Sequence, residues 1–200
     1  VNPNPVVTAS VDFIEICLGD AVVFTGGGAD SYSWDLGVTD GVAFIPAAAG
    51  TTTYTVTGTT SATGCQNTAT IAVTVYNIPT VTATATPAEI CIGETIIFTG
   101  GGADTYLWDG GITNGIAFTP LSSGSFTYNV IGSLGASGCE NTASISIVVN
   151  DLPIVTASVD DPAICLGESV IFTGGGADSY LWDMGVTVGL AFTPGGIGTL

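Results

Sequence analysis

Threonine alternates with apolar residues in the stretch Thr53-Tyr54-Thr55-Val56-Thr57, and the stretch Ile71-Ala72-Val73-Thr74-Val75 alternates in the same way. A period of two places successive side chains on opposite faces of an extended chain. Both stretches therefore predict half-buried β-strands. Helical periodicity is seen nowhere in the chain, so the sequence predicts an all-β fold.

The chain repeats itself with a period of 74 residues. Cysteine, tryptophan and a Gly-Gly-Gly-Ala-Asp block each recur at this spacing, without gaps. We therefore expect three domains: repeat 1 (1–77), repeat 2 (78–150) and repeat 3 (151–200). Repeat 3 is expected to be incomplete, with Leu200 at the start of a strand, so that the chain continues or a neighbouring chain donates the missing strand. The recurring positions are Cys17, Cys91 and Cys165; Cys65 and Cys139; Trp34, Trp108 and Trp182; and 26–30, 100–104 and 174–178.

Short strands separated by Gly, Pro and Asp clusters are typical of a β-sandwich. We expect each tryptophan, Trp34, Trp108 and Trp182, to be a core residue, with a platform for stacking sugars as the alternative. With seven strands the two ends of a domain lie at opposite ends of the sandwich, so the copies stack head to tail. The strands expected in repeat 1 are 6–11, 21–25, 31–35, 38–39, 42–45, 51–59 and 67–76.

Charge excludes several functions. The chain has no Lys, Arg or His and 17 acidic residues, for a net charge of −17. Nucleic acids and anionic membrane surfaces are therefore not expected partners, since both are bound through cationic side chains. Histidine general bases and lysine Schiff bases are excluded by composition, so we expect no enzyme, no catalytic residue and no cofactor. Apolar runs are too short to cross a membrane, and no membrane insertion is expected in this segment.

Segment 90–149 carries a family resemblance. It contains Ile-Cys-Ile-Gly-Glu-Thr-Ile-Ile-Phe-Thr, Tyr-Leu-Trp-Asp, Gly-Ser-Phe-Thr-Tyr-Asn-Val and Gly-Cys-Glu-Asn-Thr-Ala-Ser-Ile-Ser-Ile-Val-Val. These strings resemble the Ig-like and PKD-like repeats of giant secreted Bacteroidetes adhesins, including gliding-motility adhesins exported by type nine secretion. The resemblance implies tandem Ig-like sandwiches at the cell surface. The turn Trp34-Asp35-Leu36-Gly37-Val38 departs from the Trp-x-Phe-Gly-Asp-Gly of PKD repeats.

The five cysteines predict disulfides in an oxidising compartment, because they form no CxxC pair and the chain has no histidine. Pairing within a repeat would join Cys17 to Cys65 and Cys91 to Cys139. In an Ig-like order, however, strands 21–25 and 51–59 run the same way, which separates Cys17 from Cys65 by about 20 Å, beyond the roughly 7 Å limit between Cα atoms. Head-to-tail stacking instead brings Cys17 to Cys139. We favour this inter-repeat pair, and an unexpected strand order would restore the alternative.

Acidic residues recur in register and are expected to cap turns and keep the surface soluble. Calcium bound near domain junctions is a weaker alternative, with Asp30, Asp104, Asp178 and Asp151 as candidate ligands. The Gly-Gly-Gly block lacks the lysine and helix of a phosphate loop, and it predicts a turn with positive φ.

Near-identical copies indicate that the repeats serve to build a long, extended molecule. We expect a structural stalk or filament segment of a long extracellular adhesin, acting in cell-surface adhesion and gliding motility. The alternatives are a multivalent carbohydrate-binding Ig-like module and a donor-strand-assembled filament subunit. Expected partners are neighbouring repeats of the same chain, surface glycans, or other rods through lateral self-association.

Overall fold

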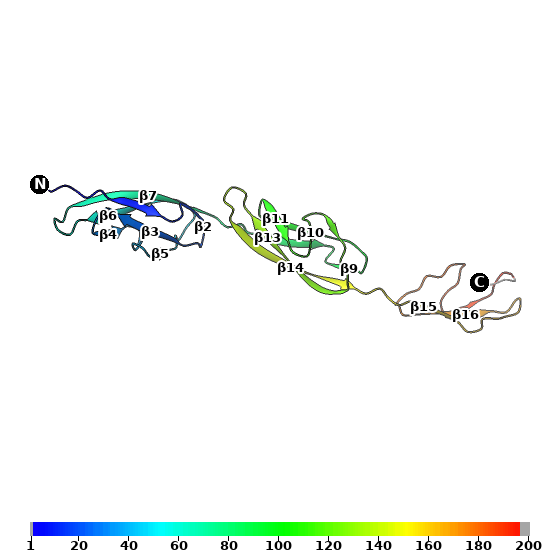
Figure 1. Ribbon diagram of the computed structural model, residues 1–200. Coiled ribbons are helices and arrows are strands. Elements are labelled where there is room, and N and C mark those ends of the chain that lie inside the picture. Colours follow the sequence, from blue (N-terminus) through cyan, green and yellow to red (C-terminus); the bar gives the residue numbers. More distant parts are fainter. Residues whose placement is uncertain (1, 197–200) are drawn as a thin grey trace.

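The computed structural model describes residues 2–196, which contain β-strands and no helix. The strands form three units that follow one another along an elongated molecule, with the N-terminal unit at one end and the C-terminal unit at the other (Figure 1). Each unit coincides with one sequence repeat. The protein is therefore a tandem, head-to-tail array of Ig-like β-sandwich repeats, as the sequence predicts.

Repeat 1 is a sandwich of two sheets. A three-stranded sheet has the order β1-β3-β5, and a four-stranded sheet has the order β2-β7-β6-β4. The long hairpin of β6 and β7 carries the alternating threonine and apolar residues, with Tyr54 paired to Ile71. The strands are β1 (Thr8–Val11), β2 (Glu15–Cys17), β3 (Val22–Gly27), β4 (Ser31–Trp34), β5 (Ala43–Phe44), β6 (Gly50–Thr59) and β7 (Gln66–Tyr76).

Repeat 2 has the same topology, with sheets β12-β10-β8 and β11-β13-β14-β9. In repeat 3 the described residues form one sheet, β15-β16-β17; the expected repeat runs to Leu200, and 197–200 lie outside the described part. The strands are β8 (Thr82–Thr86), β9 (Glu89–Cys91), β10 (Ile96–Gly101), β11 (Thr105–Trp108), β12 (Ala117–Phe118), β13 (Gly124–Ser133), β14 (Glu140–Asn150), β15 (Thr156–Val159), β16 (Val170–Gly175) and β17 (Ala191–Phe192).

Repeats 1 and 2 each have their own apolar core between the two sheets. Phe24 is fully buried at the centre of repeat 1, and its ring lies 5.2 Å from that of Trp34 and 4.5 Å from that of Tyr54. Phe98 holds the equivalent place in repeat 2. Such tilted and edge-on aromatic pairs add to the stabilisation from burial. The inward set of the period-two pattern thus forms the core.

The first strand is divided, which the sequence reading missed. β1 pairs antiparallel with β3, and the chain then crosses to the other sheet, where β2 pairs in parallel with β7. A strand of only three residues is too short to show a period of two, so the sequence predicts a single first element at 6–11. This crossing places Cys17, the last residue of β2, on the four-stranded sheet beside Tyr76 at the end of β7.

The short strand expected at 38–39 is wrong. Leu36 and Gly37 adopt positive φ angles of 50° and 80°, which turn the chain directly after β4. Val38 then points inward and is only 7% exposed. The Val38 side chain packs in the apolar core of repeat 1, and its backbone forms no strand.

The three glycines of the Gly-Gly-Gly block have two different roles. Gly28 has a φ of +82°, as a turn with positive φ requires. Gly26 instead lies under the ring of Tyr32, and a Cβ at Gly26 would overlap that ring. Gly27 faces Thr8 just as closely. The prediction of a positive-φ turn therefore holds for the third glycine, and the first two are needed for close approach.

Candidate functional site: the junction between repeats

Repeats 1 and 2 are joined by a disulfide between Cys17 and Cys139, which are 122 residues apart in the sequence. Cys17 is the last residue of β2, and Cys139 lies in the turn between β13 and β14. Their Cα atoms are 5.7 Å apart, within the usual range for a disulfide. The bond therefore links one end of the first sandwich to a turn of the second.

The turn after β2 holds Cys17 in place. The backbone N–H of Cys17 donates to Oδ2 of Asp20 at 3.0 Å, and the N–H of Asp20 donates back to the Cys17 carbonyl at 3.0 Å. The next residue, Leu18, donates its N–H to the carbonyl of Tyr76 at the end of β7. Asp20 thus acts as a turn cap, and the parallel pairing with β7 fixes the direction of Cys17.

The β13–β14 turn holds Cys139 by a comparable set of bonds. Leu134 N–H donates to the Cys139 carbonyl at 2.9 Å, and Cys139 N–H donates to Oγ of Ser137 at 3.3 Å. Oδ2 of Asp104 accepts the N–H of Gly135 at 2.8 Å, which ties this turn to the loop before β11. Cys139 is only 1% exposed, and its sulfur is bonded to Cys17 of the neighbouring repeat.

The peptide linker forms the second connection between the repeats. β7 ends at Tyr76, and the carbonyl of Pro79 then accepts a hydrogen bond from Nδ2 of Asn141 on β14, at 3.0 Å. Asn67 makes the same bond to Pro5 in repeat 1. Sequence reasoning missed this clamp, although Asn67 and Asn141 stand at the same place in two repeats. The linker is therefore held along the last strand of the repeat that follows.

The pairings within a repeat, Cys17 with Cys65 and Cys91 with Cys139, do not form in this structure. Cys17 and Cys65 lie at opposite ends of the same sandwich, because β2 runs parallel to β7 while Cys65 lies in the turn where β7 begins. Among the described residues, Cys65, Cys91 and Cys165 remain unpaired.

Two of the four candidate calcium ligands have structural roles in loops. Oδ2 of Asp30 accepts the N–H of Ser61 at 2.7 Å, just as Asp104 accepts that of Gly135, so both side chains cap loops. Asp178 and Asp151 are exposed in repeat 3. Within residues 2–196, no three side chains of the His, Cys, Asp and Glu types are grouped to hold a metal ion. Calcium binding stays a prediction.

Trp34 and Trp108 are core residues, 8% and 5% exposed, so neither presents a ring face for a sugar to stack on. Their indole groups are fixed by a polar side chain that sequence reasoning did not identify. Nε1 of Trp34 donates to Asp40, and Nε1 of Trp108 donates to Asn114. Trp182 of repeat 3 is partly buried.

Tyrosines beside acidic residues have perturbed acidity. Burial raises the pKa of Tyr54, and the carboxylate of Asp35 raises it further. Burial and Asp109 act in the same way on the pKa of Tyr128. Both phenols therefore stay neutral up to a higher pH than an ordinary tyrosine does.

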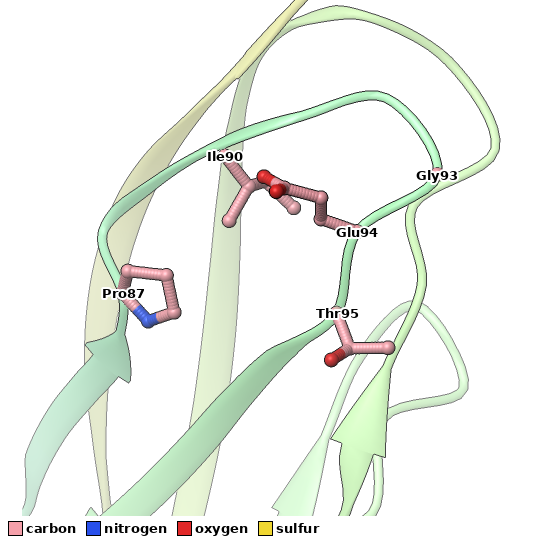
Figure 2. Close-up of a pocket in the computed structure, with 5 residues that line it drawn as sticks. All are labelled: Pro87, Ile90, Gly93, Glu94 and Thr95. Atoms are coloured by element: carbon pink, nitrogen blue, oxygen red, sulfur yellow. The ribbon is translucent and has the colours of Figure 1, made fainter.

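An open hollow of about 420 Å³ lies beside Cys91, at the end of repeat 2 that leads to repeat 3. Figure 2 shows the side chains around it, with the carboxylate of Glu94 over Ile90. Oε2 of Glu94 accepts the N–H of Cys91 at 2.8 Å, as Asp20 does for Cys17. The hollow therefore lies at the position that, in repeat 1, adjoins the disulfide. It is lined by Pro87, Ile90, Gly93, Glu94 and Thr95.

No protein-family model matches the chain, and no curated protein matches it. Among solved structures, the chain is similar to the fibronectin(III)-like modules of CbhA from Clostridium thermocellum. The sequence identity is 15% and the TM-score 0.34, over 72% of this chain and 95% of that chain. The two-sheet strand pairing of repeats 1 and 2 defines the sandwich independently of this similarity. In the described residues no helix has the length and apolar character needed to cross a membrane.

Proposed function

We propose that this chain is a structural stalk segment of an extracellular repeat protein that acts in cell-surface adhesion, with gliding motility as the setting that the resemblance implies. The observation that carries the proposal is the Cys17–Cys139 disulfide, which adds a second covalent connection to a pair of consecutive repeats. Two connections at different points of one junction restrict bending and twisting, whereas a single linker acts as a hinge. A stiff, extended product is what a stalk requires.

Location and composition support the same proposal. Disulfides persist in oxidising compartments such as the cell surface. The absence of Lys and Arg removes every site for trypsin-like proteases, which suits an exposed protein. The burial of Trp34 and Trp108 disfavours the sugar-stacking alternative.

Small-angle X-ray scattering tests the proposed stiffening. We compare the oxidised protein with the double variant Cys17→Ser/Cys139→Ser and with the matched control Cys65→Ser/Cys91→Ser. Loss of the disulfide is expected to broaden the distribution of interatomic distances and shorten the mean end-to-end length, while the control keeps the wild-type curve. Identical curves for all three proteins would refute the stalk proposal.

The pairing itself is checked by peptide mapping under non-reducing conditions. Trypsin has no site in this chain, but combined cleavage at aspartate and glutamate places each of the five cysteines on its own peptide. A linked peptide containing Cys17 and Cys139 is expected. A Cys17–Cys65 peptide would overturn the junction as described.

A further inference from the structure

Asn114 is the only asparagine of the sequence that is followed directly by glycine. Glycine has no Cβ to shield its backbone nitrogen, so in an Asn-Gly pair this nitrogen attacks the asparagine side-chain amide with little hindrance. The other repeats have Asp40-Gly41 and Val188-Gly189 at the same place. Repeat 2 therefore differs from them in having a side-chain amide where the next residue can attack it.

The glycine of this pair is required by a turn. Ile116 donates its N–H to the carbonyl of Thr113 at 3.1 Å, and Gly115 has a φ of +73°. A positive φ at the third residue alone is characteristic of a type II turn. Gly41 and Gly189 occupy the equivalent place, with φ angles of 72° and 71°. An asparagine before this glycine therefore always forms the reactive pair.

The folded protein restrains both reacting groups. Gly115 donates its N–H to the carbonyl of Phe98 on β10 at 2.8 Å. Oδ1 of Asn114 accepts the N–H of Gly100 at 2.6 Å and Nε1–H of Trp108 at 3.0 Å. A type II turn also keeps its second residue extended, with a ψ of about +120°, which turns the following nitrogen away from the side-chain amide. Reaction between the two groups therefore requires the turn to open.

We propose that Asn114 is a site of spontaneous deamidation, which the fold protects and which reacts when repeat 2 opens locally. The backbone nitrogen of Gly115 bonds to Cγ of Asn114 and gives its proton to a solvent base, and the Cγ–Nδ2 bond breaks as ammonia leaves. Water then hydrolyses the resulting succinimide ring to aspartate or isoaspartate. The net reaction consumes water and releases ammonia, without oxidation or reduction, and it does not depend on the proposed stalk function.

The two products have different effects on the turn. Aspartate is the residue that repeat 1 already has, and Oδ1 of Asp40 accepts the equivalent bonds from Gly26 and Trp34. Conversion to aspartate therefore preserves the turn. Isoaspartate carries the main chain through the side-chain carbon and lengthens it, so the bonds across 113–116 lose their register. Local opening of repeat 2 is thus followed by a permanent covalent change.

The test compares the whole oxidised chain when folded and when unfolded in guanidinium chloride, at the same mildly alkaline pH. Cleavage at glutamate after reduction gives peptide 95–140, in which mass spectrometry measures deamidation at position 114. Conversion is expected to be at least about tenfold slower in the folded protein, because only the locally opened fraction reacts. Asn129 in the same peptide precedes valine and is the internal control. Equal rates at Asn114 in both states, or no conversion in the unfolded chain, would overturn the proposal.

Asp40→Asn transfers the site to repeat 1. Gly41 donates its N–H to the carbonyl of Phe24 at 2.8 Å, as Gly115 does to Phe98. The new asparagine is therefore expected to be protected in the folded protein and to react rapidly once unfolded. Rapid conversion in the folded variant would show that the turn gives no protection.

Trp108→Phe removes one of the two donors to Asn114 and is expected to speed its conversion several-fold in the folded protein. Trp34→Phe makes the matched change in repeat 1 and should leave conversion at Asn114 unchanged. Asn114→Asp represents the aspartate product, and hydrogen exchange in repeat 2 should then match that of the wild type. An unchanged rate in Trp108→Phe, or equal acceleration by both tryptophan variants, would contradict protection by these bonds.

Discussion

Trp34 and Asp40 are joined by a hydrogen bond of 2.8 Å from the indole Nε1 to Oδ1, and this oxygen also accepts the N–H of Gly26 at 2.7 Å. One carboxylate oxygen therefore satisfies two partly buried donors, one on β3 and one on β4. Asn114 does the same for Trp108 and Gly100 in repeat 2. Both donors would lack a partner without it.

Replacing Asp40 with valine is expected to destabilise repeat 1 by about 2 to 4 kcal/mol, because unsatisfied buried donors cost about 1–3 kcal/mol each. Asp40→Asn is the control, since it keeps the oxygen that Asn114 supplies in repeat 2. Hydrogen exchange measured by mass spectrometry follows both repeats at once. Faster exchange in repeat 1, with repeat 2 unchanged, is the expected result, and equal exchange in Asp40→Val and wild type would contradict it.

Repeat 3 offers the reverse experiment. Valine occupies position 188, where the other repeats have Asp40 and Asn114, and Nε1 of Trp182 is buried without a hydrogen-bond partner among the described residues. Val188→Asn is expected to supply the missing acceptor and to slow exchange of the Trp182 indole proton several-fold, as seen by NMR. Val188→Thr, which is shorter, serves as the control. An unchanged exchange rate in Val188→Asn would show that the amide does not reach the ring.

Alkaline pH is expected to destabilise repeats 1 and 2 through Tyr54 and Tyr128. Their pKa values are raised in the folded protein, so the folded state favours the neutral phenol. The resulting stability is fully present below the unfolded pKa of about 10 and is lost as pH rises through the folded pKa. Ultraviolet absorbance of tyrosinate follows the titration. Asp35→Asn should lower the pKa of Tyr54 and leave that of Tyr128 unchanged, and a common shift in both would contradict this.

Acid or calcium is expected to bundle the rods. All 17 charged side chains are carboxylates, so neighbouring rods repel one another at neutral pH and low salt. This repulsion is removed when the carboxylates are protonated near the sequence pI of about 4.1, or when millimolar calcium bridges them. Strand edges of neighbouring rods can then associate. Light scattering should rise while far-UV circular dichroism is unchanged, and chelation should reverse the calcium effect. Flat scattering between pH 7 and 4 would contradict the prediction.

Most of the fold could be predicted from the sequence, because the long strands β6 and β7 show a clear period of two and the repeats define their own boundaries. The expected strand order also predicted that Cys17 is too far from Cys65 and can reach Cys139. The division of the first strand could not be predicted, since β2 has three residues and gains its stability from pairing with β7. The role of Asp40 was missed because its partner on β3 becomes a neighbour only in the folded sandwich.

The parallel pairing of β2 with β7 has a mechanical consequence. Tension along the array pulls β2 toward the N-terminal end and β7 toward the C-terminal end, so their hydrogen bonds are sheared together instead of being opened one by one. The disulfide connects Cys17, the C-terminal end of β2, directly to repeat 2. Part of the tension therefore passes from β2 through the disulfide to repeat 2, without passing through β7 and the linker. Force therefore passes from repeat 1 to repeat 2 along two covalent routes, and a repeat that begins to unfold extends only as far as the cross-link permits.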